Sequence, residues 1–170
     1  MDGEGSATPP PSPAAEGQRA APLNPRLAAR LRRHPPGAPR ATCADAPPPA
    51  LRTAIAQFNQ RAFFECHETL EALWNAEPGP VRTLYKGILQ VGVGCYHLLR
   101  RNYHGATVKL RAGASYLEPF AGGCLGVDVA RLIAEARALL AAVEALGPER
   151  FTQVDLALIP FVHTADDHCA

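Results

Sequence analysis

The stretch of sequence that decides the fold is LRTAIAQFNQRAFFECHETLEALW, residues 51–74. From Leu51 to Trp74 its apolar side chains recur at a spacing close to 3.6 residues, the period of one face of an α-helix. The next six residues are NAEPGP, residues 75–80, whose glycine and prolines end a helix. We therefore predict one long helix over residues 51–74.

Three further helices are predicted downstream. The second covers about 81–101, the third covers 103–117, and the fourth runs from its N-cap at Asp128 to Gly147. Because the connections are short, consecutive helices should be antiparallel neighbours. The sequence therefore predicts an all-α protein, in which residues 51–150 form a single bundle of four to five helices.

The two ends of the chain differ from this helical domain. Residues 1–50 hold 12 of the 17 prolines and no aromatic residue, so they have little apolar surface to bury and are expected to be disordered. Within them, LNPRLAARLRRHPP (23–36) is either a basic docking peptide for an acidic partner or a solvated tail. Residues 151–170 mix β-branched and apolar residues around Pro160, which favours an extended strap over the bundle.

The composition limits the classes of molecule that the protein is expected to bind. The net charge is +1, no apolar run could span a bilayer, and no basic patch is interleaved with aromatic residues. We therefore expect no nucleic acid and no membrane as partner, and a small molecule or a protein stays open. The composition does not fix an oligomeric state.

The five cysteines are dispersed, odd in number and free of any Cys-x-x-Cys pair. This pattern argues against a disulfide framework and for a reducing compartment. We therefore expect free thiols and a cytoplasmic protein.

A polar stripe crosses the apolar part of the first helix. At about 100° per residue, His67, Glu71 and Trp74 share one stripe. Glu68 borders this stripe, and Glu65 points toward water. Of the three acids, only Glu71 is expected to share the face of His67.

A second polar stripe runs along the second helix, through Gln90, Gly94 and His97. Gly87 and Gly94 each cost about 1 kcal/mol of helix stability relative to alanine. Because glycine has no side chain, we expect these positions to allow close backbone approach to another helix. We infer that this stripe faces the His67 stripe of the first helix.

Two kinds of chemistry fit such a cluster. His67, Glu71 and His97 form a two-histidine, one-carboxylate set that suits zinc, iron or manganese, with an open position for water. Gln90 would orient a ligand, and Glu68 is the candidate general base of a metal-dependent hydrolase. These roles require the side chains to converge.

The alternative is a helical scaffold or interaction module without catalysis. In it, His67 pairs with Glu71 and Gln90 pairs with His97, in a polar network that fixes helix register. A third possibility is a small-ligand pocket walled by Trp74 and Tyr96.

Residues 58–113, from FNQRAFFECHETLEALW to HGATVKLRAG, resemble the bacterial and archaeal domain-of-unknown-function family 309. The resemblance rests on His-x-x-x-Glu-x-x-Trp, here His67, Glu71 and Trp74, and on the second helix with its Tyr96-His97 pair. It implies an all-helical fold and a His/Glu motif that binds metal. No activity or substrate comes with it.

Overall fold

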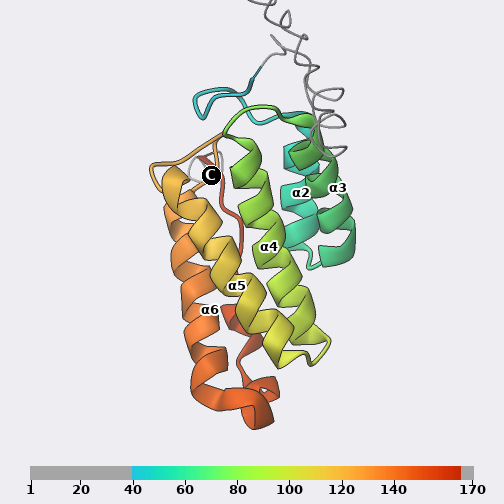
Figure 1. Cartoon of the computed structure of the whole chain (residues 1–170), viewed down its shortest axis with the longest axis vertical. Coiled ribbons are helices and arrows are strands. Elements are labelled where there is room, and N and C mark those ends of the chain that lie inside the picture. Colours follow the sequence, from blue (N-terminus) through green and yellow to red (C-terminus); the bar gives the residue numbers. More distant parts are fainter. Residues whose placement is uncertain (1–39, 166–170) are drawn as a thin grey trace, which may run out of the picture.

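The computed structural model of the chain describes residues 40–165 (Figure 1). This part holds five α-helices and no strand, so the predicted all-α bundle is confirmed. The predicted disordered segment lies outside the described residues as far as residue 39, and so do the last five residues of the chain. The helices are α2 (Pro49–Asn59), α3 (Phe63–Ala76), α4 (Arg82–Leu99), α5 (Tyr103–Leu117) and α6 (Val129–Arg150).

The long first helix of the prediction is wrong, because residues 51–74 fold into two helices. The chain turns between α2 and α3 at Arg61, which adopts a left-handed conformation with φ of 61°. Phe58 and Phe63 flank this turn and pack edge to face, with their ring centroids 5.3 Å apart. Each helix buries its own apolar face, so the apolar period continues across a turn that has neither glycine nor proline.

Helix α4 packs so closely on α5 that three glycines are needed at the contact. A Cβ on Gly94 would lie 2.9 Å from the backbone nitrogen of Leu110, and one on Gly113 would lie 2.7 Å from that of Val91. A Cβ on Gly87 would meet the side chain of Leu117 at 2.7 Å. The close approach predicted from the glycines is therefore present, but α5 is the neighbour, not the helix that carries His67.

Side-chain caps begin the last two helices. The Asn102 side chain accepts a hydrogen bond from the backbone N–H of Gly105 at the start of α5. The Asp128 side chain accepts one from Arg131 N–H at the start of α6, where a cap was predicted. Near its end α6 kinks at Gly147, whose φ is 71°.

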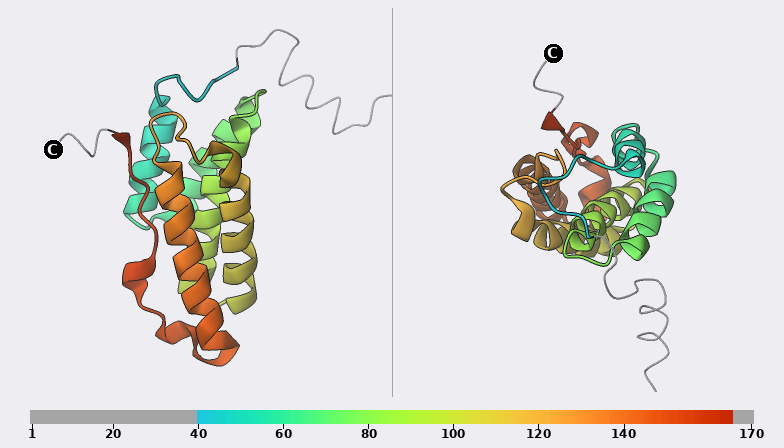
Figure 2. Two further views of the ribbon diagram at one scale, coloured as in Figure 1. Left: turned by 90° about the vertical axis from the view of Figure 1, so that its left-hand side faces the viewer. Right: turned by 90° about the horizontal axis from the view of Figure 1, so that it is seen from above.

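The strap predicted after α6 is present and joins the first helix to the last. It runs back along α6 from Phe151 and includes two short 3₁₀ turns (Figure 2). The Asn59 amide of α2 donates to the carbonyl of Val162 and accepts from its N–H, at 3.0 and 2.8 Å. The N–H of Phe161 donates to Glu135 of α6. The strap thereby closes the bundle.

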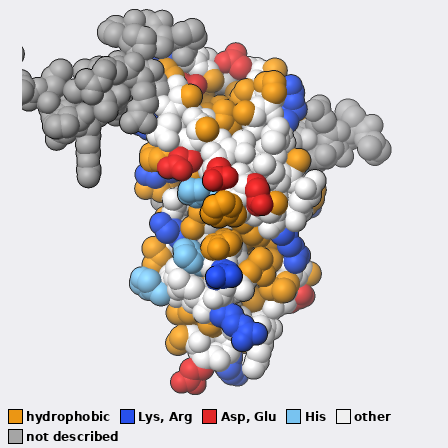
Figure 3. Space-filling model, turned by 90° about the vertical axis from the view of Figure 1, so that its right-hand side faces the viewer, with side chains coloured by type: hydrophobic (Ala, Val, Ile, Leu, Met, Phe, Trp, Pro, Cys, Tyr) orange, Lys and Arg blue, Asp and Glu red, His pale blue; other side chains and the backbone are white. Residues whose placement is uncertain are grey.

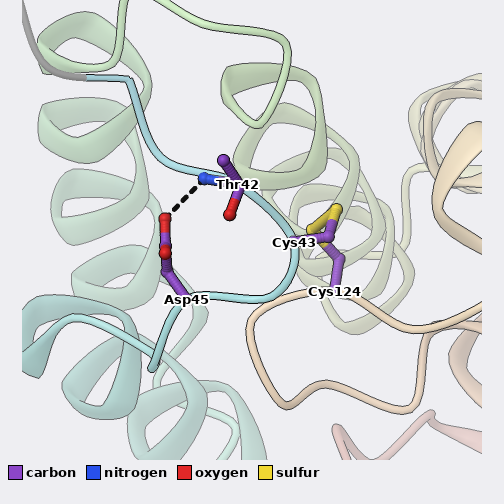
Figure 4. The surroundings of a disulfide bond; sticks show 4 residues. All are labelled: Thr42, Cys43, Asp45 and Cys124. Atoms are coloured by element: carbon purple, nitrogen blue, oxygen red, sulfur yellow. Dashed lines mark hydrogen bonds between the residues drawn. A yellow bond between two sulfur atoms is a disulfide. The ribbon is translucent and has the colours of Figure 1, made fainter.

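Residues 40–48 lie against the top of the bundle before α2 begins. The backbone N–H of Ala41 donates to Glu77, and Cys43 forms a disulfide with Cys124 of the loop between α5 and α6 (Figure 4). The interpretation of the cysteines as free thiols is therefore wrong for this pair. The sequence did not reveal this bond, because its two cysteines are 81 residues apart and, among residues 40–165, Cys66 and Cys95 are unpaired and buried.

None of the described helices is long and apolar enough to cross a membrane.

Candidate functional site

A pocket of about 260 Å³ opens between the first half of α3 and the last half of α4. Its walls are aromatic and aliphatic except for two imidazoles. The lining residues are Phe63, Phe64, His67, Val93, Tyr96 and His97. Three larger hollows, of about 430, 390 and 330 Å³, lie at loops and helix ends elsewhere, and none of them contains a histidine. The two predicted histidines are therefore brought to one pocket.

The His97 ring is oriented by the cap of the next helix. The amide nitrogen of Asn102 lies 3.2 Å from His97 Nδ1, and the amide oxygen of Asn102 accepts from Gly105 N–H at 2.9 Å. Because a backbone N–H only donates, the cap fixes which end of the amide faces His97. Asn102 therefore donates to Nδ1, and a neutral His97 carries its proton on Nε2.

His67 is half-buried in the wall of the same pocket. In the described part of the chain, no hydrogen bond joins His67 to Glu71 or Gln90 to His97. His97 pairs with Asn102 instead. The hydrogen bonds of the alternative polar network are therefore not formed among these residues.

The carboxylates of α3 stay outside the pocket. Glu65, Glu68 and Glu71 are all exposed, and none of them lines it. Within residues 40–165, no three His, Cys, Asp or Glu side chains are grouped so that they could hold a metal ion. In the described structure His67, His97 and Glu71 are therefore not gathered into the predicted two-histidine, one-carboxylate group, and a neutral His97 carries its proton on Nε2.

Trp74 lies apart from the histidine pocket, in a cluster with cationic side chains. The Lys86 ammonium lies 5.7 Å from the centre of the Trp74 ring and 4.2 Å from that of Tyr116 on α5. The guanidinium of Arg82 lies 5.3 Å from the same tryptophan. Such distances are those of cation–π contacts. Of the two predicted aromatic walls, only Tyr96 lines the pocket, and Gln90 does not.

The sequence interpretation missed Phe64, Val93 and Asn102. Phe64 and Val93 look like ordinary apolar helix residues, and only the tertiary arrangement makes them pocket walls. Asn102 does carry a signal, because asparagine directly before a helix is a preferred N-cap. Its second contact, with His97 five residues earlier, follows from the tight turn between α4 and α5.

The free thiols beside the site are chemically quiet. Burial raises the pKa of Cys66 on α3 to about 12 and that of Cys95 on α4 to about 12. The thiolate is the reactive form, so neither cysteine is a nucleophile near neutral pH.

Part of the chain is similar in sequence to known proteins. Residues 51–108 match the family described as "Domain of unknown function (DUF309)". The chain is 38% identical over 76 residues to "Uncharacterized protein YpuF" of Bacillus subtilis (strain 168). The match covers 43% of this chain and 44% of that protein, so the chain spans less than half the length of this curated relative. No solved structure matches the chain.

The matched residues include α2 from Leu51 onward, all of α3 and α4, and the start of α5, and therefore both pocket histidines and Asn102. The resemblance noted in the sequence is thereby confirmed: over residues 51–108 the chain matches the domain-of-unknown-function family DUF309.

Proposed function

We propose that the protein binds a small, mainly apolar organic molecule carrying a hydrogen-bond acceptor, in the pocket between α3 and α4. The observation that carries this proposal is the orientation of His97. Its Nδ1 is engaged by Asn102, which leaves the protonated Nε2 as the donor that the ring can offer a ligand.

The walls of the pocket support an apolar body for the ligand. Phe63 and Val93 provide aromatic and aliphatic surface, and Tyr96 and Phe64 flank the opening. A volume of about 260 Å³ lies just below the usual range for ligand pockets of roughly 300–1,000 Å³, so a one-ring molecule fits better than a nucleotide. A carboxylate or amide oxygen is the acceptor that an imidazole N–H binds well.

A divalent metal is the second candidate, because two imidazoles share one pocket. His67 has both ring nitrogens available within the described residues, whereas His97 would have to move its proton to Nδ1 and displace Asn102. Zinc, iron or manganese would then depend on water for its other ligands. A metal-dependent hydrolase would further need a base, and Glu68 does not line the pocket.

Titration with one-ring probes tests the main proposal. Benzoate and benzamide carry acceptor oxygens, whereas benzylamine has the same ring and no such oxygen. We expect the first two to shift the NMR signals of Val93 and His97, and benzylamine to leave them unchanged. Equal binding of all three would overturn the role of His97 as donor.

Matched histidine variants localise the binding. His97→Leu removes the donor from the pocket, and His104→Leu removes an exposed histidine of α5 that does not line it. We expect benzoate binding to be lost in the first variant and kept in the second. Elemental analysis of freshly purified wild type and His67→Ala tests the metal. A stoichiometric metal lost in His67→Ala would favour the second candidate.

A further inference from the structure

The face around the pocket exposes large apolar side chains. Phe64 of α3 is 60% exposed, and Tyr96 in the last turn of α4 is 37% exposed. Leu99, one turn beyond Tyr96, is 42% exposed. Single exposed apolar residues are ordinary, but a contiguous group of them marks an interaction surface. On the side of the molecule where α3 lies, hydrophobic side chains gather at the centre of the face (Figure 3).

Opposite charges flank this apolar centre. Glu65, Glu68 and Glu71 are exposed along α3. Arg100 and Arg101 are exposed at the end of α4. In Figure 3 the acidic side chains form a row above the hydrophobic centre, and lysine and arginine side chains lie below it. The face is therefore acidic at one end and basic at the other.

The two charged ends lie at similar distances from the apolar centre. Phe64 and Tyr96 line one pocket, and α3 and α4 run in opposite directions from it (Figure 1). Glu68 follows Phe64 by four residues, which is about 6 Å along α3. Arg100 follows Tyr96 by four residues, which is about 6 Å along α4 in the opposite direction.

We propose that this face binds a second copy of the chain across a twofold axis that passes close to Phe64 and Tyr96. A twofold interface brings the same patch of both subunits together. A charge on one side of the axis therefore faces the partner's residue that lies at the same distance on the other side of the patch. Glu68 then faces Arg100 of the partner subunit, and Arg100 faces the partner's Glu68. The apolar centres cover each other, and the charges fix the orientation.

Such a dimer would also cover the pocket, because Phe64 and Tyr96 belong both to the pocket and to the proposed interface. The inference does not depend on the identity of the ligand, since it uses only exposure and charge. It differs from docking of the chain's own residues 23–36, which are basic but have no acidic half to meet Arg100.

Charge exchange between subunits provides the test. Glu68→Lys and Arg100→Glu each place like charges opposite one another in a homodimer, so sedimentation should show each variant as a monomer. In a mixture of the two variants, the introduced lysine faces the introduced glutamate, and the unchanged Glu68 faces the unchanged Arg100. Both contacts then join opposite charges, so the mixture should form dimers. The double variant Glu68→Lys/Arg100→Glu should likewise dimerise as the wild type does.

Two exposed charges at the end of α6 serve as controls. Glu149→Lys and Arg150→Glu make the same charge changes on α6, outside the α3 and α4 residues of this face, and should keep the wild-type dimer. Circular dichroism confirms that each variant is folded. A wild type that stays monomeric up to millimolar concentration would overturn the proposal, as would a mixture that stays monomeric. Intramolecular docking of residues 23–36 would give the first of these results.

Discussion

Asn102 connects the start of α5 to the pocket, because its side chain contacts His97 and Gly105 at once. Its amide nitrogen lies 3.2 Å from His97 Nδ1, and its amide oxygen lies 2.9 Å from Gly105 N. A Cβ on Gly105 would come within 2.7 Å of His97 Cγ, so glycine at this position leaves room for the ring. The geometry of the helix start thus determines which nitrogen of His97 is protonated.

Replacing Asn102 should therefore affect both stability and the pocket. Asn102→Ala removes an N-cap and should cost about 1 kcal/mol in free energy of unfolding. Asn102→Asp keeps a cap, but its carboxylate can only accept, so a neutral His97 should move its proton to Nδ1. Nitrogen chemical shifts of the imidazole report the tautomer. We expect Asn102→Asp to weaken benzamide binding and to strengthen zinc binding relative to the wild type.

The matched control is Asp128→Ala, which removes the corresponding cap from α6 far from the pocket. It should lose a similar amount of stability and leave benzamide binding unchanged. Identical His97 tautomers in the wild type and in Asn102→Asp would contradict the link between the cap and the pocket.

Most of the fold could be predicted from the sequence, because residues that typically begin or end helices stand near most of the helix termini. Asp128 and the prolines near residue 79 are local signals that mark helix boundaries in the structure, whereas Gly147, the predicted end of the last helix, marks a kink inside α6. The turn at Arg61 could not be predicted, because Arg61 adopts a left-handed conformation without the glycine or asparagine that usually indicates one. When the apolar spacing continues through such a turn, the sequence cannot show whether the apolar side chains belong to one helix or to two.

The candidate site was predicted in part for a related reason. Helical phase put His67 and His97 near each other, and in the structure both are half-buried and line one pocket between neighbouring helices. The helical spacing could not show that the glycines of α4 face α5. Because they do, the polar stripe of α4 lies at an open pocket. The carboxylate of Glu71, one turn from His67 on the helix, stays in solvent.

The disulfide should contribute strongly to stability. Because Cys43 and Cys124 are 81 residues apart, the chain-entropy model gives about 4.5 kcal/mol for closing this loop. Urea denaturation of the wild type should shift to lower midpoints when a reductant is added, whereas Cys43→Ser/Cys124→Ser should not respond to it. In the denatured, unreduced protein, Cys66 and Cys95 should react with a thiol reagent, and Cys43 and Cys124 should not. Reaction at Cys43 or Cys124 before reduction would contradict the bond.

The disulfide also bears on the compartment. Such bonds persist in oxidising environments, so the cysteines no longer support the expected cytoplasmic location. That location stays a prediction.

The contact between α4 and α5 should not tolerate a methyl group. Gly94→Ala places a Cβ 2.9 Å from the backbone nitrogen of Leu110, which cannot move without separating the helices. We expect a loss of about 1–3 kcal/mol, although alanine is the better helix former. Gly122→Ala is the control, because a Cβ there meets nothing within 4 Å. Equal stability of the two variants in urea denaturation would contradict the close approach.

The strap should depend on Asn59. Its side chain both donates to and accepts from Val162, so Asn59→Ala removes two hydrogen bonds and leaves backbone groups of the strap without these partners. At about 1 kcal/mol for each bond, the variant should lose roughly 2 kcal/mol. Hydrogen exchange should show faster exchange at Val162 N–H and unchanged exchange within α4. Uniformly faster exchange along the whole chain would instead indicate global destabilisation.

Burial of the two free thiols should make the fold sensitive to alkali. Burial raises the pKa of Cys66 and of Cys95 from 9.0 to about 12, so the unfolded chain releases these protons at lower pH than the folded one. Above pH 9 the unfolded state therefore binds fewer protons, and stability falls as pH rises. The stabilisation is complete below pH 9 and is lost between pH 9 and 12. Urea midpoints measured across that window should fall steeply for the wild type and less steeply for Cys66→Ala/Cys95→Ala. Parallel declines in the two proteins would assign the alkaline sensitivity to other groups, of which Tyr85, with its pKa raised to about 12, is the first to examine.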